Sequence, residues 1–156
     1  MQKLCLDTKV IMKPSEITSD LDKFLMETIR TNRQYLNSAE HGCIAKVNKI
    51  IDHTNIVSSV TSNIVYTVKI EVERLLPIQG LKLLVEIKML LSTGILCQLY
   101  DIKFWIPATK TGGYKYIHNK YVKKDSELQQ GDEVQIQILE IRYEKKTFSC
   151  IALLTT

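Results

Sequence analysis

The chain has 156 residues, of which 45% are hydrophobic and 24% are charged, and its formal net charge is +4. These totals are typical of a globular protein with room for one domain or two small ones. No apolar run approaches the ~20 residues that a membrane span needs. The opening MQKLCLDTKV carries charges where a signal peptide would be apolar, so we expect an intracellular protein.

The first half predicts a strand, a helix and then further strands. Alternating hydrophobic and charged residues predict a half-buried strand over residues 3–13, which Pro14 ends. Apolar residues at helical spacing predict a helix over residues 15–31, with acids early and bases late, as the helix dipole favours. A strand over residues 43–51, a polar loop or short hairpin over 52–63, and a strand over 64–73 follow. We therefore predict an α+β domain at residues 1–78.

The second half predicts strands alone. Pro77 and Gly80 interrupt an apolar run, and alternation then predicts strands over residues 81–91, 95–99 and 102–106. A long basic connection separates them from two more strands, over residues 134–141 and 147–154. Five strands with a long link after the third are typical of an OB-type Greek-key barrel. We predict such an all-β barrel at residues 79–156.

The cysteines and histidines do not show metal-site spacing. They are scattered singly, at Cys5, Cys43, Cys97, Cys150, His41, His53 and His118. We expect reduced core cysteines, surface histidines, no metal and no cofactor. The sequence also lacks a Ser/His/Asp arrangement, a phosphate-binding glycine loop and paired carboxylates on a defined scaffold, so we predict no enzyme activity.

Several motifs together resemble one protein family. The stretch YTVKIEVERLLPIQG matches the pattern Y-x-V-x-Y-x-A-x-x-F-x-P-x-x-G through Tyr66, Val68, Pro77 and Gly80. HGCIAKVNKI fits an upstream strand pattern, and QQGDEVQIQILEIRYEKKTFSCIALL fits a closing pattern that ends in an arginine, here Arg142. The chain thereby resembles the stalk subunit of multisubunit DNA-dependent RNA polymerases, which is the seventh subunit of eukaryotic polymerase II or its archaeal counterpart.

The resemblance implies a non-catalytic polymerase subunit. Its N-terminal domain would dock on the polymerase core, and its barrel would guide nascent RNA and assist initiation. A small helical companion, like the fourth polymerase subunit, is a further implied partner, and no membrane is involved. The chain would act in the nucleus if it is cellular and eukaryotic, or in the host cytoplasm and the virion if it is viral.

Some family features are missing. Ile95 and Leu96 stand where the family has an aromatic residue after the turn glycine, Gly94, and Tyr100 and Asp101 replace its Gly-Pro pair. These positions lie on or beside the face that meets RNA in the family. The departures suggest a divergent copy carried by a large DNA virus.

A basic, aromatic stretch is the predicted RNA-binding region. Residues 102–124 contain six lysines and no acidic residue. Lysine side chains can contact the phosphates of a single-stranded nucleic acid while aromatic rings stack on its bases. The predicted contacts are Lys103, Trp105, Lys110, Tyr114, Lys115, Tyr116, Lys120, Lys123 and Lys124. The alternative is a solvated lysine-rich loop whose tyrosines pack against the barrel.

Three apolar residues in the polar segment 52–63 are the predicted docking contact with the polymerase core: Ile56, Val57 and Val60. They could equally cap the core of their own domain. Two rival functions stay open: a free-standing OB-fold protein that binds RNA or single-stranded DNA, and an interaction module with no nucleic-acid role.

Overall fold

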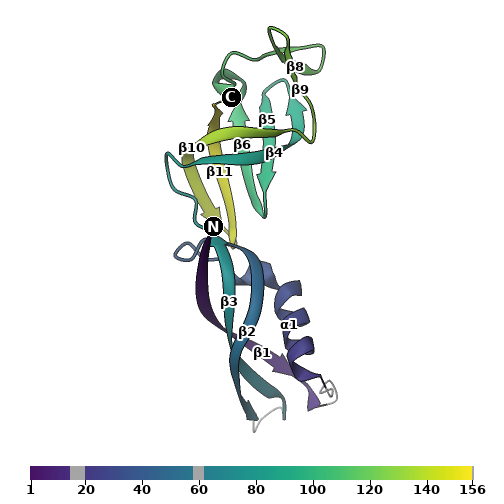
Figure 1. The fold of residues 1–156 in the computed structure, drawn as a ribbon, viewed down its shortest axis with the longest axis vertical. Helices are drawn as coiled ribbons and strands as arrows, with labels where there is room; N and C mark the ends of the chain where they lie inside the picture. The colour runs from purple at the N-terminus through teal and green to yellow at the C-terminus, as the bar shows by residue number, and fades with distance from the viewer. Residues whose placement is uncertain (15–19, 58–61, 156) are drawn as a thin grey trace. The chain divides into compact units, whose positions relative to one another are not determined.

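The structure is a computed structural model that describes residues 1–14, 20–57 and 62–155. The chain divides into two compact units, Met1–Leu75 and Leu76–Thr156 (Figure 1). The fold is mostly β, and α1 is the one α-helix among the described residues.

The first unit is a three-stranded antiparallel sheet with a helix on one face. Its strand order is β1-β3-β2, and the helix and strands are β1 (Gln2–Met12), α1 (Leu21–Thr31), β2 (Cys43–Val57) and β3 (Ile64–Leu75). The sequence alternates in β1 and β3 because one face of each strand is buried under the helix. The core on that face includes Val10, Leu25, Ile29, Val68 and Ile70.

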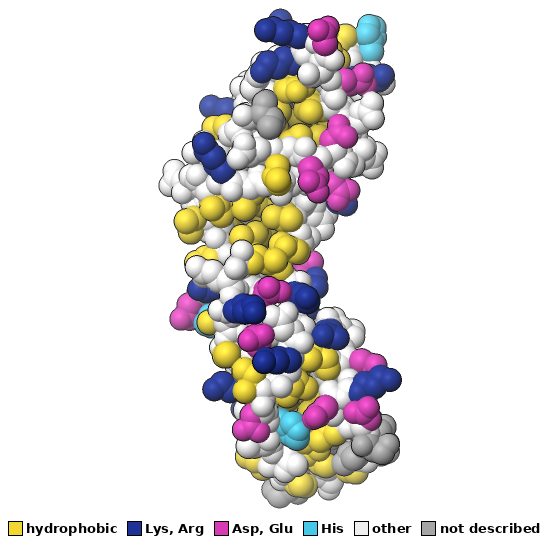
Figure 2. Space-filling view, viewed as in Figure 1, with side chains coloured by type: hydrophobic (Ala, Val, Ile, Leu, Met, Phe, Trp, Pro, Cys, Tyr) yellow, Lys and Arg dark blue, Asp and Glu magenta, His cyan; other side chains and the backbone are white. Residues whose placement is uncertain are grey.

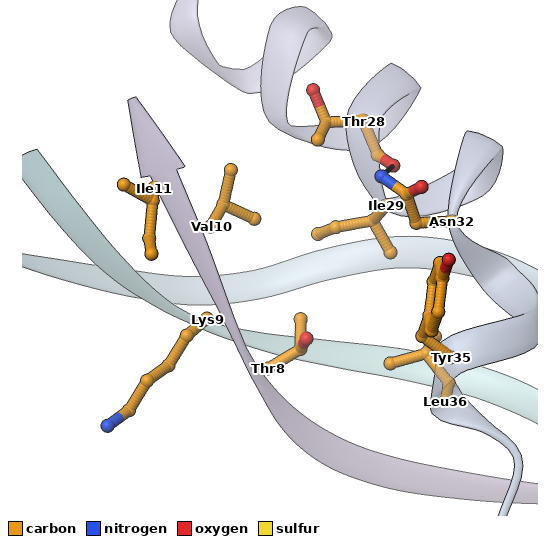
Figure 3. A pocket seen from close by; sticks show the side chains of 9 residues that line it. All are labelled: Thr8, Lys9, Val10, Ile11, Thr28, Ile29, Asn32, Tyr35 and Leu36. Carbon is orange, nitrogen blue, oxygen red and sulfur yellow. Dashed lines mark hydrogen bonds between the residues drawn. The ribbon is translucent and has the colours of Figure 1, made fainter. Parts of the chain in front are cut away.

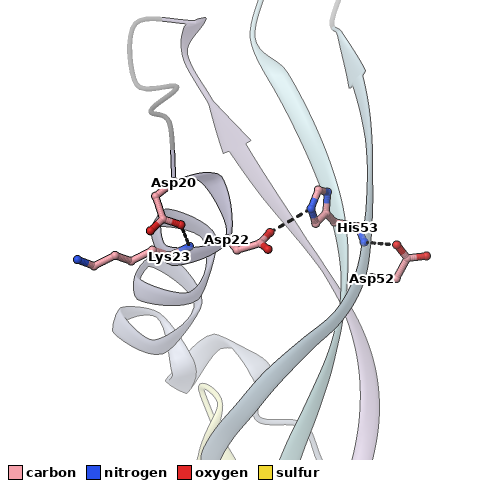
Figure 4. Close-up of polar contacts among 5 residues, drawn as sticks. All are labelled: Asp20, Asp22, Lys23, Asp52 and His53. Carbon is pink, nitrogen blue, oxygen red and sulfur yellow. Dashed lines mark hydrogen bonds and ion pairs between the residues drawn. The ribbon is translucent and has the colours of Figure 1, made fainter.

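Polar contacts fix the start of α1 and join it to β2. The side chain of Asp20 accepts a hydrogen bond from the Lys23 backbone N–H at 3.2 Å, which caps the first turn. Asp22 contacts the His53 ring at 3.2 Å between Oδ1 and Nε2, and this contact links the helix to the strand (Figure 4). Residues 15–19 of the predicted helix lie outside the described residues.

Strand β2 is longer than the sequence predicts. It continues to Val57, and residues 52–57 pair with residues 64–69 of β3, so of the two expectations for 52–63, a loop or a short hairpin, the loop was wrong for 52–57. Its Ser, Thr and Asn content indicated a loop, but solvent-facing positions of an exposed ribbon tolerate polar residues, and Thr and Ile favour strands.

Strand β2 follows β3 through three register shifts, which leave Ala45, Asn48 and Ile51 outside the paired register. Arginines from the helical segment satisfy backbone carbonyls at this irregular edge. Arg30 donates to the Val47 carbonyl oxygen at 3.2 Å from Nη2, and Arg33 donates to that of Ala45 at 3.1 Å. The end of α1 and the 3-10 turn η2 (Arg33–Leu36) are thereby attached to the sheet.

The second unit is a closed five-stranded barrel. Its strands are β4 (Lys82–Leu91), β5 (Gly94–Leu99), β6 (Ile102–Pro107), β10 (Glu133–Glu144) and β11 (Thr147–Leu154). They close in the order β10-β11-β6-β5-β4, and the contact between β11 and β6 is parallel. Apolar side chains fill the interior, including the fully buried Ile87, Ile95, Phe104 and Ile136.

The basic connection contains a small sheet where the sequence predicted only a long link. After the 3-10 turn η3 (Ala108–Lys110), three short antiparallel strands follow: β7 (Lys115–Ile117), β8 (Lys120–Lys123) and β9 (Ser126–Leu128). We call this the small sheet. His118 and Asn119 join its first two strands with φ of 51° and 65°, as in a type I′ turn. Strands of three or four residues are too short to produce a clear periodic pattern.

Candidate nucleic-acid interface

Strand β6 places two predicted RNA contacts on the outside of the barrel. Ile102, Phe104 and Ile106 are fully buried, so alternation turns Lys103 and Trp105 outward. Lys103 is exposed, whereas Trp105 is half-buried. The sequence-based division of β6 into an inner and an outer side is confirmed.

The strand register arranges the barrel exterior into two parallel rows. The first, the apolar row, runs across β4, β5, β6 and β11 and ends at an acid on β10: Met89, Leu96, Trp105, Ile151 and Glu140. The second, the polar row, crosses the same strands: Glu86, Gln98, Lys103, Ser149 and Arg142. An aromatic and aliphatic line therefore lies directly beside a line that contains two cations. Figure 2 shows hydrophobic side chains gathered on the viewed face of this unit.

The indole of Trp105 packs against Gly94. A Cβ atom added to Gly94 would clash first with the Ile106 backbone carbonyl oxygen and would lie 2.6 Å from Cζ2 of Trp105, a distance that real contacts do not reach. Glycine is therefore required at this position for a steric reason. The aromatic residue expected just after Gly94 is missing, but a ring from the neighbouring strand lies against the same glycine.

A groove opens beside Trp105 on the outer wall. Its volume is about 330 Å³, and its lining residues are Trp105, Glu140, Ile141, Arg142, Ser149, Cys150 and Ile151. Glu140 and Arg142 are exposed, and neither side chain makes a hydrogen bond or ion pair with another described residue. We call this the wall groove. Sequence reasoning did not assign Glu140 or Ile151 to a site, because only the register brings β10 and β11 beside Trp105.

Several of the predicted RNA contacts on and beside the small sheet have partners within the protein. Lys120 forms an ion pair with Glu127 at 3.1 Å, and Lys123 donates to the Gly112 carbonyl oxygen at 2.9 Å. The Lys123 ammonium also lies 5.7 Å from the centroid of the Tyr114 ring. These lysines thus contribute to the local structure as well as to the positive charge.

The tyrosines of the small sheet also pack within the protein. The Tyr116 ring packs on that of Tyr121 with centroids 5.2 Å apart, and its hydroxyl donates to Asn119 at 2.9 Å. Tyr121 is buried, and its hydroxyl donates to the Leu91 carbonyl oxygen at the end of β4. Lys110, Lys115 and Lys124 are exposed and have no such partner among the described residues.

Two thiols inside the barrel are protonated at neutral pH. Burial raises the pKa of Cys97 to about 12 and that of Cys150 to about 11. A protonated, buried thiol is a poor nucleophile and metal ligand. Among the described residues, no cluster of three or more His, Cys, Asp or Glu side chains could hold a metal ion. The described helices include none long and apolar enough to cross a membrane.

Two of the predicted docking residues, Ile56 and Val57, lie within the part of the chain that the structure describes. Ile56 and Val57 are exposed by 73% and 63%, but as adjacent strand residues they point to opposite faces of the sheet. Ile56 pairs with Val65, and Val65 pairs with Ile11, so these three form an apolar cluster on the face opposite α1, which we call the sheet cluster. Val60 lies outside the described residues.

A second groove lies in the first unit, between β1 and the helical segment α1–η2 (Figure 3). Its volume is about 440 Å³, and its lining includes Thr28, Asn32 and Tyr35. The polar atoms of its helical wall are engaged: Thr28 donates to the Phe24 carbonyl oxygen at 2.9 Å, and Asn32 donates to that of Thr28 at 3.1 Å. The Lys9 side chain points away from the helix in Figure 3, and nothing in the groove suggests a particular ligand.

Comparison with known proteins gives one informative similarity. No model of a known protein family matches the chain. The chain is similar to a protein of Acanthamoeba polyphaga mimivirus named "Putative DNA-directed RNA polymerase subunit", with 24% identity over 144 residues. The match covers 88% of this chain and 72% of the relative, so it extends into both units.

Proposed function

We propose that this chain is a non-catalytic, stalk-type subunit of a multisubunit DNA-dependent RNA polymerase. The observation that carries the proposal is the similarity to the mimivirus protein, which spans most of both chains. That protein's name supports a polymerase subunit as the general class. The stalk assignment rests on the order of the sequence motifs and on the two-unit architecture.

The barrel topology supports an OB-type assignment. Its first three strands form a meander, the fourth (β10) pairs with the first (β4), and the fifth (β11) pairs in parallel with the third (β6). This strand order agrees with that of the five-stranded Greek-key barrel with which OB folds bind single-stranded nucleic acid, and it supports the proposal. We infer that the barrel exterior contacts nascent RNA through Lys103 and Trp105, aided by the exposed lysines of the small sheet.

The docking role belongs to the first unit in this proposal. The sheet cluster of Ile11, Val65 and Ile56 would contact the polymerase core, because exposed apolar side chains beside one another favour a protein partner. Val57 would reach the core from the opposite face of the same strand. A fourth-subunit-like companion stays an expectation of the resemblance, as does action in the nucleus or, for a viral copy, in host cytoplasm and virion.

Copurification tests the assignment to a polymerase. The tagged full chain, purified at native salt from the cells in which it occurs, should bring down the large polymerase subunits. Ile56→Asp should weaken this association, whereas Ile117→Asp, at another exposed apolar position on the small sheet, should not. Recovery of the chain without polymerase subunits would refute the stalk assignment.

The second candidate is a free-standing OB-fold protein that binds RNA or single-stranded DNA. The barrel face and its adjacent lysines favour it because they need no polymerase to work. It predicts RNA binding by the purified chain without polymerase copurification. In either case the double variant Trp105→Ala/Lys110→Ala should lower RNA affinity, and an unchanged affinity would show that another surface binds RNA.

A further inference from the structure

The wall groove has the dimensions of a site for one flat ring. Ser149 and Ile151 on β11 form its floor, Trp105 on β6 forms one wall, and Glu140 and Arg142 on β10 form the other. Because β6 and β10 both neighbour β11, the walls are two strand spacings apart, roughly 10 Å. This width leaves room for one base that lies over the Trp105 indole with its edge turned towards Glu140.

The aromatic wall is held in place before any ligand arrives. The Trp105 indole packs against Gly94 on one side and borders the groove on the other. A fixed ring loses little freedom when a base stacks on it, and such stacking contributes about 1–3 kcal/mol per base. Ile151, exposed by 37%, extends the apolar surface beneath it.

The opposite wall offers polar side chains that have no partner among the described residues. Glu140 faces Trp105 across Ile151, and Arg142 faces Lys103 across Ser149. An ionised carboxylate only accepts hydrogen bonds, whereas a guanidinium only donates them and can also stack on a flat ring. A ligand for this groove therefore needs a stacking surface, hydrogen-bond donors for Glu140, and negative charge that can reach Arg142 in its lining and Lys103 beside it.

The chemistry of the four RNA bases distinguishes among them. Guanine presents two adjacent N–H donors on its Watson–Crick edge, which match the two oxygens of one carboxylate. Adenine and cytosine place an acceptor beside their amino group, and uracil places its single N–H between two carbonyl oxygens. Unstacked bases in single-stranded RNA are read on these edges while they stack on aromatic rings.

We propose that the wall groove is a base-binding subsite for guanine in single-stranded RNA. Trp105 stacks on the base, Glu140 accepts from its N1–H and N2–H groups, and Arg142 and Lys103 interact with the adjoining phosphates. The inference deepens the proposed RNA-guiding role and rests on it. It adds base selection, which that role does not require.

The single tryptophan makes the test direct, because Trp105 is the only tryptophan in the chain. The purified full chain is titrated with oligouridine and with the same oligomer carrying one central guanosine, adenosine or cytidine. Trp105 fluorescence and the anisotropy of labelled RNA are both recorded. The guanosine oligomer should quench the tryptophan most strongly and bind about tenfold more tightly than oligouridine, the low part of the range for a bidentate contact.

Variants separate base selection from general affinity. Glu140→Gln should abolish the preference for guanosine and leave oligouridine affinity nearly unchanged, whereas Arg142→Ala should weaken all oligomers alike. Glu133→Gln, an exposed acid at the other end of β10, is the matched control and should keep the preference. Because Glu140, Arg142 and Glu133 are all exposed, thermal melts should show that the variants fold normally.

The possible failures are distinguishable. Equal quenching and affinity for all oligomers would overturn the guanine assignment. RNA binding without tryptophan quenching would overturn the subsite but leave RNA guidance intact. A tryptophan signal that responds to polymerase core and not to RNA would make this face a protein contact and overturn the subsite. Loss of both RNA binding and polymerase copurification would instead reject the proposed function.

Discussion

Two exposed β surfaces of this protein use charge in opposite ways. On the sheet face opposite α1, charges alternate in sign across the strands, as in Lys3–Glu73–Lys46 and Asp7–Lys69–Asp52. On the barrel exterior, Lys103 lies between the uncharged Gln98 and Ser149, next to the apolar row. Figure 2 shows basic and acidic side chains interspersed on the viewed face of the first unit.

The difference indicates on which surface charged side chains are free of opposite cross-strand neighbours and can interact with a ligand. Opposite charges in register offset one another, stabilise the sheet modestly and suit a solvated face. A cation without an acidic cross-strand neighbour, beside an aromatic ring, keeps its attraction for an anion and its stacking surface. This difference supports the proposed RNA contact on the barrel wall and the proposed protein contact at the apolar end of the first sheet.

The change with the largest expected effect is Gly94→Ala. The added methyl group would clash with the Ile106 carbonyl oxygen and the Trp105 indole, so β6 and its indole must shift, and the free energy of unfolding should fall by roughly 2–3 kcal/mol. RNA affinity should fall in the same variant because the stacking ring moves. Chemical denaturation and RNA anisotropy measure the two effects. Wild-type stability would show that neither the Ile106 backbone nor the indole requires glycine at this position.

The two buried thiols of the barrel predict that the free energy of unfolding falls at alkaline pH. The pKa values of Cys97 and Cys150 are raised from 9.0 to about 12 and about 11, so both thiols stay protonated in the folded state at pH 10. The unfolded chain loses these protons above pH 9, so stability is complete below that pH and declines as pH rises towards 11–12. The loss between pH 8 and pH 10 should be about 1 kcal/mol for each thiol.

Replacing both cysteines by alanine provides the control for that pH dependence. The double variant starts from a lower stability because alanine is smaller, but its decline between pH 8 and pH 10 should be shallower. An identical slope in wild type and variant would assign the decline to other groups.

A matched pair of charge reversals tests the two surfaces directly. Lys69→Glu would place three acids side by side with Asp7 and Asp52, and it should lower the free energy of unfolding by about 1 kcal/mol. Lys103→Glu has uncharged cross-strand neighbours and should change stability by less than about 0.5 kcal/mol. Urea denaturation of both variants measures the contrast, and equal losses would contradict it.

The smallest expected effect concerns the salt dependence of RNA binding. Lys103→Ala should reduce the slope of log affinity against log salt by about 1, since one phosphate contact is lost. Lys49→Ala, an exposed lysine on the first sheet, should leave the slope unchanged. If the two variants have the same slope, Lys103 does not contact phosphate.

Individual strands were predictable from sequence because their signals are local. Alternation located β1, β3, β4 and β6 and assigned Trp105 to the outside of the barrel. The end of β2 and the small sheet were missed. The end of β2 has polar residues on an exposed ribbon, and the small sheet has strands too short to show a periodic pattern.

The candidate site was predictable only in part for a related reason. Lys103 and Trp105 lie within one strand, so their shared side follows from the sequence. Glu140 and Ile151 come from strands much later in the chain, and only the β6–β11–β10 register places them in one groove with Trp105.

The amino-acid sequence by itself determined the inner and outer sides of most strands, the break at Pro77 and Gly80, and the surplus of lysines after β6. The tertiary structure decided which of those outer residues are neighbours, and it engaged Lys120 and Lys123 in contacts within the protein. The physical reason is range: side-chain alternation is a property of adjacent residues, whereas barrel closure and strand register depend on pairing between distant segments.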